Sequence, residues 1–325
     1  MTLFADIALL AFLIAAAIAI LRKRDLFTIA MLSGVYGLLS AAVFVALDAP
    51  DVAMTEAAVG AGTSTVLMLA TLHFVGREAM PPRKRPLLAL IVTVAVGSAL
   101  VYGVSDLPLF GDPKAPAHGD VARHYLERTG EEIGIPNVVT AVLASYRGFD
   151  TLGETAVILT AGIGVLALLG MLPRRQRREV GAEPAPHRDH TILRVVAKML
   201  LPLLLMFACY VQAHGELSPG GGFQAGVVFA TAFLLYALVF GTRRARAIVP
   251  EAWLERGMAG GLLVYGSVGV VTLLRGGAFL DYDVLAADPT VGQHVGIIAI
   301  ELGVGATVAS VLIAVFFAFA DVDPA

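Results

Sequence analysis

Nine long apolar segments, separated by polar connections, constrain this chain more than any other feature. Each holds about 20 mostly apolar residues, the length that an α-helix needs to cross a bilayer. The segments are 2–21, 26–47, 52–75, 87–104, 152–172, 195–213, 221–241, 257–274 and 294–319. The chain is 58% hydrophobic and 15% charged, whereas soluble domains carry about a quarter charged residues. The sequence therefore predicts an all-α polytopic membrane protein with about nine transmembrane helices.

Short basic clusters predict the orientation of these helices. The clusters are Arg22–Arg24, Arg83–Arg85, Arg174–Arg178 and Arg243–Arg246. An N-terminus outside the cell places all four clusters inside, as the positive-inside rule requires, and the C-terminus is then also inside. The first segment precedes its basic cluster and has no small-residue cleavage site, so we expect a retained span. The single cysteine, Cys209, excludes an internal disulfide and a cysteine-rich metal site.

Carboxylates within the apolar segments are the first functional candidates, because a charge in a bilayer is costly and usually faces a partner or an ion path. Asp48, Asp51 and Glu56 fall within nine residues at the start of the third segment. In a helix, Glu56, Gly60 and Thr63 share one face. Asp48 and Asp51 could instead cap the helix, but Glu56 lies roughly 9 Å from its start, where the helix dipole helps little.

Two further groups of titratable residues extend this predicted ion or proton route. Asp150 and Glu154 lie one turn apart at the start of the fifth segment, although Asp150 is only a cap if the helix begins later. Glu301 follows His294 by seven residues, so the two share a face and could pass a proton. Alternatively, His294 marks the membrane interface and Glu301 pairs with another helix. Transient Na+ binding is predicted near Glu56 or Glu154.

Glycines are the second group of candidates, since they allow close approach of backbones. Helix packing is predicted at Gly60, Gly220, Gly221, Gly222 and Gly305. The run at 220–222 lacks the following lysine and the strand–helix context of a phosphate-binding loop. Alternatively, His214, Glu216 and Gln224 line an aqueous mouth there. The glycine-rich third segment is also where a π-bulge would fit.

Two long connections divide the chain. Residues 105–150 contain several prolines and should lie on the outer surface, with a short interfacial helix from Asn137 to Tyr146. Residues 173–194 combine an arginine run with prolines and predict a linker on the inside. This linker separates a five-span front part from a four-span back part.

Three sets of motifs follow one another along the chain: Ala46–Gly60, then Tyr146–Thr155, then His214–Gln224 with Glu301–Gly305. They resemble, in this order, the MbhD-like, MbhE-like and MnhB-like domains of subunits of Mrp-type multisubunit cation/proton antiporters and of the related membrane arm of membrane-bound hydrogenase. The resemblance implies a three-helix MbhD-like domain at 1–80, a two-helix MbhE-like domain with an external loop at 81–178, and a four-helix MnhB-like domain at 179–325. Relatives are expected to carry histidine or another polar residue at position 216, so Glu216 departs from the pattern.

The resemblance implies one component of a multisubunit complex in the prokaryotic plasma membrane that exchanges internal Na+ for external H+. Its expected partners are the large proton-pumping Mrp proteins of types A and D, the small ones of types C, E, F and G, the lipid bilayer, Na+ and H+, but no nucleic acid. No cofactor, resident metal or covalent chemistry is expected. Three alternatives stay open, namely a hydrogenase-like redox-driven pump arm, a purely structural subunit for assembly, and a self-sufficient transporter. Against the last, the sequence shows no inverted repeat and no pair of broken spans.

Overall fold

The computed structural model describes residues 2–75, 77–79, 86–109, 111–170 and 191–320. These residues form nine helical spans long and apolar enough to cross a membrane, and no strand, which confirms the predicted all-α polytopic class. The spans are α1 (Thr2–Arg22), α2 (Leu26–Ala46), a third span made of α3 (Pro50–Glu56), η1 (Ala57–Thr63) and α4 (Ser64–Val75), then α5 (Pro86–Ser105), α8 (Gly148–Gly170), α9 (Thr191–His214), α10 (Gly222–Phe240), α12 (Glu251–Leu274) and α13 (Pro289–Ala320).

Short helices occupy the connections between the spans. They are η2 (Pro116–His118), α6 (Asp120–Glu132), α7 (Val138–Ala141), η3 (Val142–Tyr146), α11 (Thr242–Ile248) and η5 (Tyr282–Leu285). The predicted linker centre, the basic clusters at 83–85 and 174–178, both predicted domain boundaries and the C-terminus at 321–325 lie outside the described residues.

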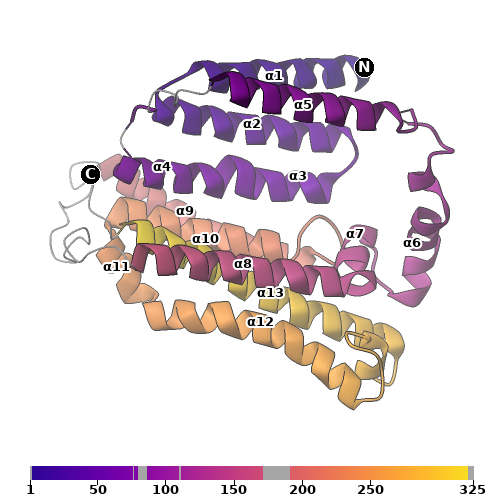
Figure 1. Ribbon diagram of the computed structural model, residues 1–325. Coiled ribbons are helices and arrows are strands. Elements are labelled where there is room, and N and C mark those ends of the chain that lie inside the picture. The colour runs from indigo at the N-terminus through magenta and orange to yellow at the C-terminus, as the bar shows by residue number, and fades with distance from the viewer. Residues whose placement is uncertain (1, 76, 80–85, 110, 171–190, 321–325) are drawn as a thin grey trace.

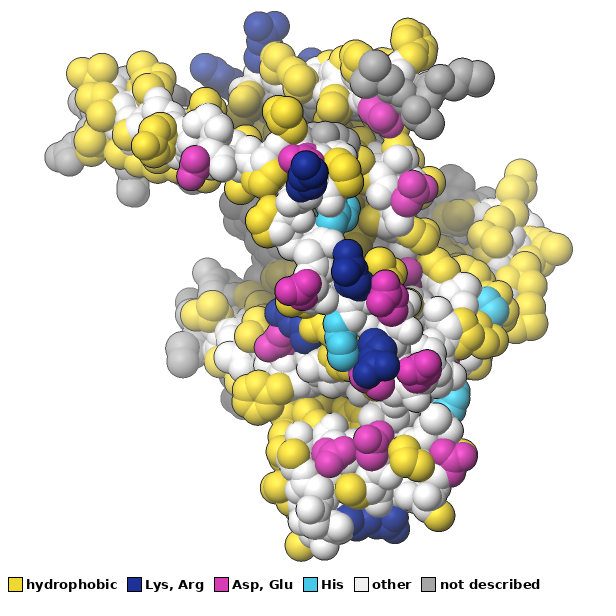
Figure 2. Space-filling view, turned by 90° about the vertical axis from the view of Figure 1, so that its right-hand side faces the viewer, with side chains coloured by type: hydrophobic (Ala, Val, Ile, Leu, Met, Phe, Trp, Pro, Cys, Tyr) yellow, Lys and Arg dark blue, Asp and Glu magenta, His cyan; other side chains and the backbone are white. Residues whose placement is uncertain are grey.

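The two basic clusters that are described lie at one end of the bundle. Arg22–Arg24 follow α1, and Arg243–Arg246 belong to α11, and both are at the left of Figure 1. We call this the basic end, and we call the opposite end, which carries α6 and η5, the α6 end. Figure 2 views the α6 end and shows acidic side chains, histidines and basic side chains interspersed on its surface. The inside and outside assignment of these ends stays a prediction.

Helix α13 lies at the centre of the packing and contacts α12, α10 and α8 along its length (Figure 1). Glycines make these contacts close. Gly222 at the start of α10 faces the backbone of Glu301, and Gly261 of α12 faces the backbone of Gly303. Neither position has room for a Cβ atom, so the missing side chains set the separation of the helices.

The third span contains a π-helix, η1, between α3 and α4. The Thr63 hydroxyl donates to the Ala58 carbonyl five residues earlier, and it lies 3.4 Å from the Thr231 hydroxyl of α10. On its other side the span meets α2, where Gly37 packs directly on the backbone of Gly60. The glycine-rich sequence of this span thus fits a π-helix held between two neighbouring helices.

Helix α8, the fifth span in the chain, packs with the four spans that follow it. It contacts α13 and α12, and Gly162 sits against Val311 of α13. Figure 1 shows α1, α2 and α5 at the opposite side of the bundle, beyond α3 and α4. Among the described side chains, α5 buries none within this chain and α1 buries only Ala16. Their surfaces are therefore available to lipid or to other proteins.

The segment from Asn137 to Tyr146 is helical, as predicted, and is partly buried within the protein; its position at the membrane interface stays a prediction. It forms α7 and η3, and Thr140, Ala141 and Ala144 are buried within the protein. The Thr140 hydroxyl donates to the Gly215 carbonyl at 2.7 Å. Part of its apolar face, at Ala141 and Ala144, therefore packs inside the protein, whereas Val139 and Leu143 stay exposed.

We expect Gly261→Ala to destabilise the protein and its neighbour Gly260→Ala to leave stability unchanged or slightly raised. A Cβ at Gly261 would collide with the Gly303 carbonyl and the Thr307 hydroxyl, whereas one at Gly260 meets nothing within 4 Å. Overpacking costs about 1–3 kcal/mol, and alanine is the better helix former. Thermal unfolding of the detergent-solubilised protein would test this pair, and equal melting temperatures would contradict the close α12–α13 contact.

Candidate functional site

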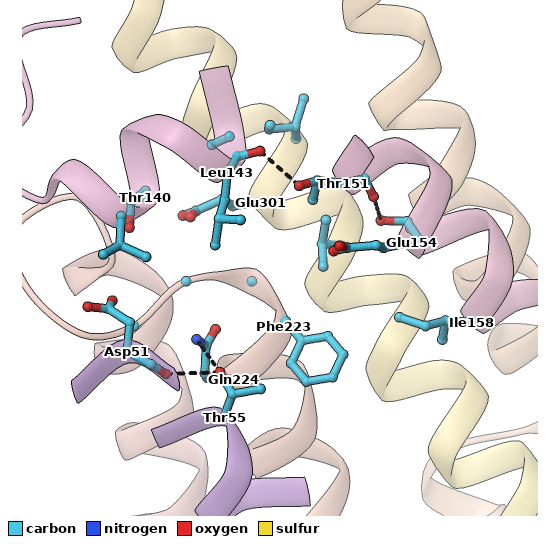
Figure 3. Close-up of a pocket in the computed structure, with 18 residues that line it drawn as sticks. Asp51, Thr55, Thr140, Leu143, Thr151, Glu154, Ile158, Phe223, Gln224 and Glu301 are labelled. Atoms are coloured by element: carbon cyan, nitrogen blue, oxygen red, sulfur yellow. Dashed lines mark hydrogen bonds between the residues drawn. The ribbon is translucent and has the colours of Figure 1, made fainter. Parts of the chain in front are cut away.

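A cavity of about 250 Å³ lies where α3, α7, η3, α8, α10 and α13 meet (Figure 3). Three acidic residues line it, each from a distant part of the sequence: Asp51, Glu154 and Glu301. The other lining residues are Thr55, Val139, Thr140, Leu143, Ala144, Thr151, Thr155, Ile158, Gly220, Gly221, Gly222, Phe223, Gln224, Ile300 and Val304. Within the described part of the chain, no lysine, arginine or histidine joins this lining. We call this cavity the acidic pocket.

Asp51 is held in the pocket by α3. Pro50 occupies the first turn of this helix, and Ala49 at the N-cap makes no side-chain cap bond. Asp51 is 9% exposed, and its Oδ1 accepts a hydrogen bond of 3.0 Å from the Asn137 amide. The position in the first helical turn also favours a negative charge. Asp51 thus combines helix-end stabilisation with a buried tertiary contact, so the two interpretations of this residue are not exclusive.

Asn137 joins three parts of the chain and is the residue that sequence reasoning missed. Besides Asp51, its amide nitrogen contacts the carbonyls of Gly215 and Ser218, each at 3.1 Å. Its own Oδ1 caps the first turn of α7. An asparagine before a helical run signals an N-cap, but no sequence pattern indicates the three distant acceptors.

Glu154 lies on α8 at the open side of the pocket and is exposed within this chain. The preceding turn is tied to η3, because the Thr151 hydroxyl donates to the Leu143 carbonyl at 2.8 Å. Asp150 does not reach the pocket. It is exposed and forms an ion pair of 2.6 Å with Arg147 at the α6 end.

Glu301 faces the glycine run that begins α10. Gly221 has a φ of 116°, in the left-handed region that favours glycine, and a Cβ there would lie 2.9 Å from Glu301 Oε1. The amide of Gln224 donates to the Thr55 hydroxyl at 2.9 Å. Its carbonyl oxygen therefore borders the same gap, 3.5 Å from that Cβ position. The missing side chain of Gly221 leaves a space between two acceptor oxygens.

Glu56 and Asp48 are not brought into the acidic pocket. The Glu56 carboxylate lies against Gly60, one turn along the same span, and Glu56 does not line the cavity. Asp48 is exposed in the turn before α3, where its φ of 56° is unusual for a residue other than glycine. The third span thus contributes Asp51 to the pocket, although Glu56 is the more deeply placed acid in the sequence.

The two predicted histidines also lie outside the pocket. The His214 ring stacks on Tyr210, with 4.7 Å between ring centroids. His294 pairs with Glu216 at 2.8 Å between Nδ1 and Oε2, although it shares α13 with Glu301. Glu216, which departs from the expected motif, thus has an imidazole as its partner.

The chemistry of the acidic pocket is that of a site for protons or hard cations. Carboxylate, hydroxyl and amide oxygens line the pocket, and a carboxylate held in a bilayer segment is stabilised by a bound proton or cation. The described residues contain no group of three or more histidine, cysteine, aspartate or glutamate side chains placed to hold a metal ion.

Known families match the chain in three segments. A family model described as a domain related to the MnhB subunit of Na+/H+ antiporter matches residues 192–314, and models described as MBH subunits D and E match residues 11–77 and 84–188. A Staphylococcus aureus (strain Newman) protein named "Putative antiporter subunit mnhB2" is 33% identical over 130 residues, which are 39% of this chain and 92% of that protein. The chain belongs to the MnhB family of antiporter subunits. It is a multi-pass protein of the prokaryotic plasma membrane.

The MnhB-family region is accompanied here by the two MBH-related segments, and longer relatives share this arrangement. A Rhizobium meliloti (strain 1021) protein, named as a probable K(+)/H(+) antiporter A/B subunit, is 31% identical over 328 residues, covering 89% of this chain and 31% of that protein. In the solved Mrp complex from Dietzia sp. DQ12-45-1b, a chain aligns with 98% of this one at a TM-score of 0.79 and 26% identity. This chain spans about a third of the length of either protein.

The acidic pocket draws one carboxylate from each matched segment. Asp51 lies within 11–77, Glu154 within 84–188 and Glu301 within 192–314. The pocket therefore exists only where all three segments are folded together.

We expect Asn137→Ala to lower stability more than removal of an ordinary helix cap. The substitution leaves the buried Asp51 carboxylate and two backbone carbonyls without this donor. Each buried group left unsatisfied costs about 1–3 kcal/mol. Asp25→Ala is the matched control, because Asp25 caps α2 through Thr28 at the protein surface. Thermal unfolding would compare them, and an Asn137→Ala loss no larger than that of Asp25→Ala would contradict the joining role.

Proposed function

We propose that this chain is one subunit of an Mrp-type complex that exchanges Na+ for H+, and that its acidic pocket binds the two ions in alternation. The observation that carries the proposal is the meeting of Asp51, Glu154 and Glu301 in one cavity that no basic side chain of the described residues lines. A function confined to assembly would not require three acids to converge from three separately matched segments.

Exchange follows from competition for the same oxygens. A carboxylate in a bilayer segment is stabilised by a proton or by a cation, and one occupant weakens binding of the other. The gap at Gly221 provides carboxylate and amide oxygens from Glu301 and Gln224, the kind of ligands that suit a hard cation. Entry of Na+ therefore releases a proton, and entry of a proton releases Na+, which is the elementary step of antiport.

The remaining parts of the chain take supporting places in this proposal. Residues 1–80, 81–178 and 179–325 act as three membrane domains that together enclose the pocket. Glu56 provides a second ion-binding position on the route, because it follows Thr55, which lines the pocket. The partners are the other proteins of an Mrp-type complex, and the driving force is the proton gradient. The process is secondary active transport without covalent chemistry.

A redox-driven ion pump is the second candidate. It is favoured by one observation, namely that two of the three family models are described as MBH subunits. The pocket would serve either machine in the same way. Genes for metal-cluster proteins beside the gene for this chain would favour the redox-driven complex, and genes for the remaining antiporter subunits would favour exchange.

We expect Glu301→Gln to reduce exchange by more than about tenfold while the complex still assembles, because an amide keeps the shape but cannot bind a proton or carry the charge. Asp51→Asn and Glu154→Gln should act in the same direction. The measurement is the Na+-induced pH change in everted vesicles from cells lacking their own antiporters, with the full set of subunits expressed. Assembly is checked on the purified complex.

Glu255→Gln is the control, since Glu255 is an exposed acid at the basic end of α12. Its transport should equal that of the unaltered complex. Transport by this chain alone would show a self-sufficient transporter. An assembled Glu301→Gln complex with full activity would instead favour a scaffold.

A further inference from the structure

A hydrogen-bonded pair, His294 and Glu216, lies at the α6 end of α13, apart from the acidic pocket. Its atoms, Nδ1 and Oε2, are 2.8 Å apart. The His294 side chain is 40% exposed and that of Glu216 is 16% exposed, so the pair leads from the surface into the protein. The second carboxylate oxygen of Glu216, Oε1, is buried and makes no hydrogen bond to the described residues.

The pair lies on the way to Glu301. His294 and Glu301 are separated by seven residues, or about 10 Å along the helix, which is too far for direct transfer. Glu216 comes from the connection between α9 and α10, and its neighbour Gly215 packs on Gly221. Gly221 in turn meets the Glu301 carboxylate.

Other charged groups near this end are engaged elsewhere. On η5, Asp283 accepts a hydrogen bond of 2.8 Å from Gln293, the neighbour of His294. Arg147 pairs with Asp150, and Arg275 donates to two backbone carbonyls. Asp51, Glu154 and Glu301 line the pocket, where Glu154 is exposed. Tyr282 of η5 packs on Gly296 of α13 and donates its hydroxyl to a backbone carbonyl.

We propose that His294 and Glu216 form a proton relay between the surface at the α6 end and Glu301, a role that rests on the exchange function proposed above. Neither residue lines the pocket. They supply its protons by a path separate from the pocket's open side at Glu154. Such a separation keeps the proton and the cation from competing for one entrance.

The relay moves one proton in balanced steps. His294 binds a proton at its half-exposed ring and becomes an imidazolium. The Nδ1 proton passes to Glu216 Oε2, which leaves a neutral imidazole and a carboxylic acid. The acid then gives its proton to the Glu301 carboxylate, directly or through one water, and Glu216 is again ionised. A cation entering the pocket drives the same steps in reverse. Only N–H and O–H bonds form and break.

The test compares Glu216→Gln with Asp283→Asn in the full complex, using everted vesicles over a range of neutral to alkaline pH. Both substitutions replace a carboxylate by an amide, and both sites adjoin the same turn of α13. Glu216→Gln should lower the maximal exchange rate by about tenfold or more and flatten its pH dependence. The Na+ concentration for half-maximal exchange should not change. Asp283→Asn should alter none of these quantities.

An exchange variant, Glu216→His with His294→Glu, keeps one imidazole and one carboxylate and should recover most of the lost rate. Should Glu216→Gln fail to assemble, His294→Gln provides the same comparison at the more exposed partner. An assembled Glu216→Gln complex with the rate and pH profile of Asp283→Asn would overturn the relay, as would an exchange variant no faster than Glu216→Gln. If the relay is overturned while the Glu301→Gln complex is inactive, the proposed exchange function is still supported. If the Glu301→Gln complex is active, the proposed exchange function is itself contradicted.

Discussion

The cost of placing carboxylates in a bilayer segment without a basic partner is the constraint on which this structure depends. Asp51, Glu154 and Glu301 converge on a cavity that no lysine, arginine or histidine of the described residues lines. A protein that needed only stability would pair or remove such charges. Here the surroundings instead accommodate these carboxylates. The Asn137 amide donates a hydrogen bond to Asp51, and Gly221, which has no side chain, leaves space beside Glu301. In the exchange function proposed above, the compensating positive charge is a mobile ion.

Close backbone contact is what lets so few polar groups define the pocket. Gly222 seats α10 directly against α13 at Glu301, and Gly261 does the same for α12 at Gly303. With lipid outside, helices gain little from apolar burial and depend on such contacts. Gly222, which also lines the pocket, therefore sets the separation of α10 and α13 beside Glu301.

The sequence predicted the spans and their class because twenty-residue apolar runs and basic clusters are local signals. It also predicted Glu154 and Glu301, since isolated acids in apolar runs stand out. It favoured Glu56 over Asp51 because the distance of a residue from the helix start follows from the sequence. The contact of Asp51 with Asn137 is tertiary and does not. The partner of His294 was equally hidden. The spacing along the sequence predicts that His294 and Glu301 share one helix face. Glu216 belongs to the connection between α9 and α10, and only the tertiary fold brings it within hydrogen-bonding distance of His294.

The exposed helices α1 and α5 have a consequence for how this chain changes over time. Apart from Ala16 in α1, none of their described side chains is buried within the chain, so the fold itself places little restriction on which apolar residue stands at most of these positions. Any restriction there must come from neighbouring molecules. Sequence variation along α1 and α5 thus reflects which molecules contact them. Residues of these helices that covary with residues of another protein would identify the interface between that protein and this chain.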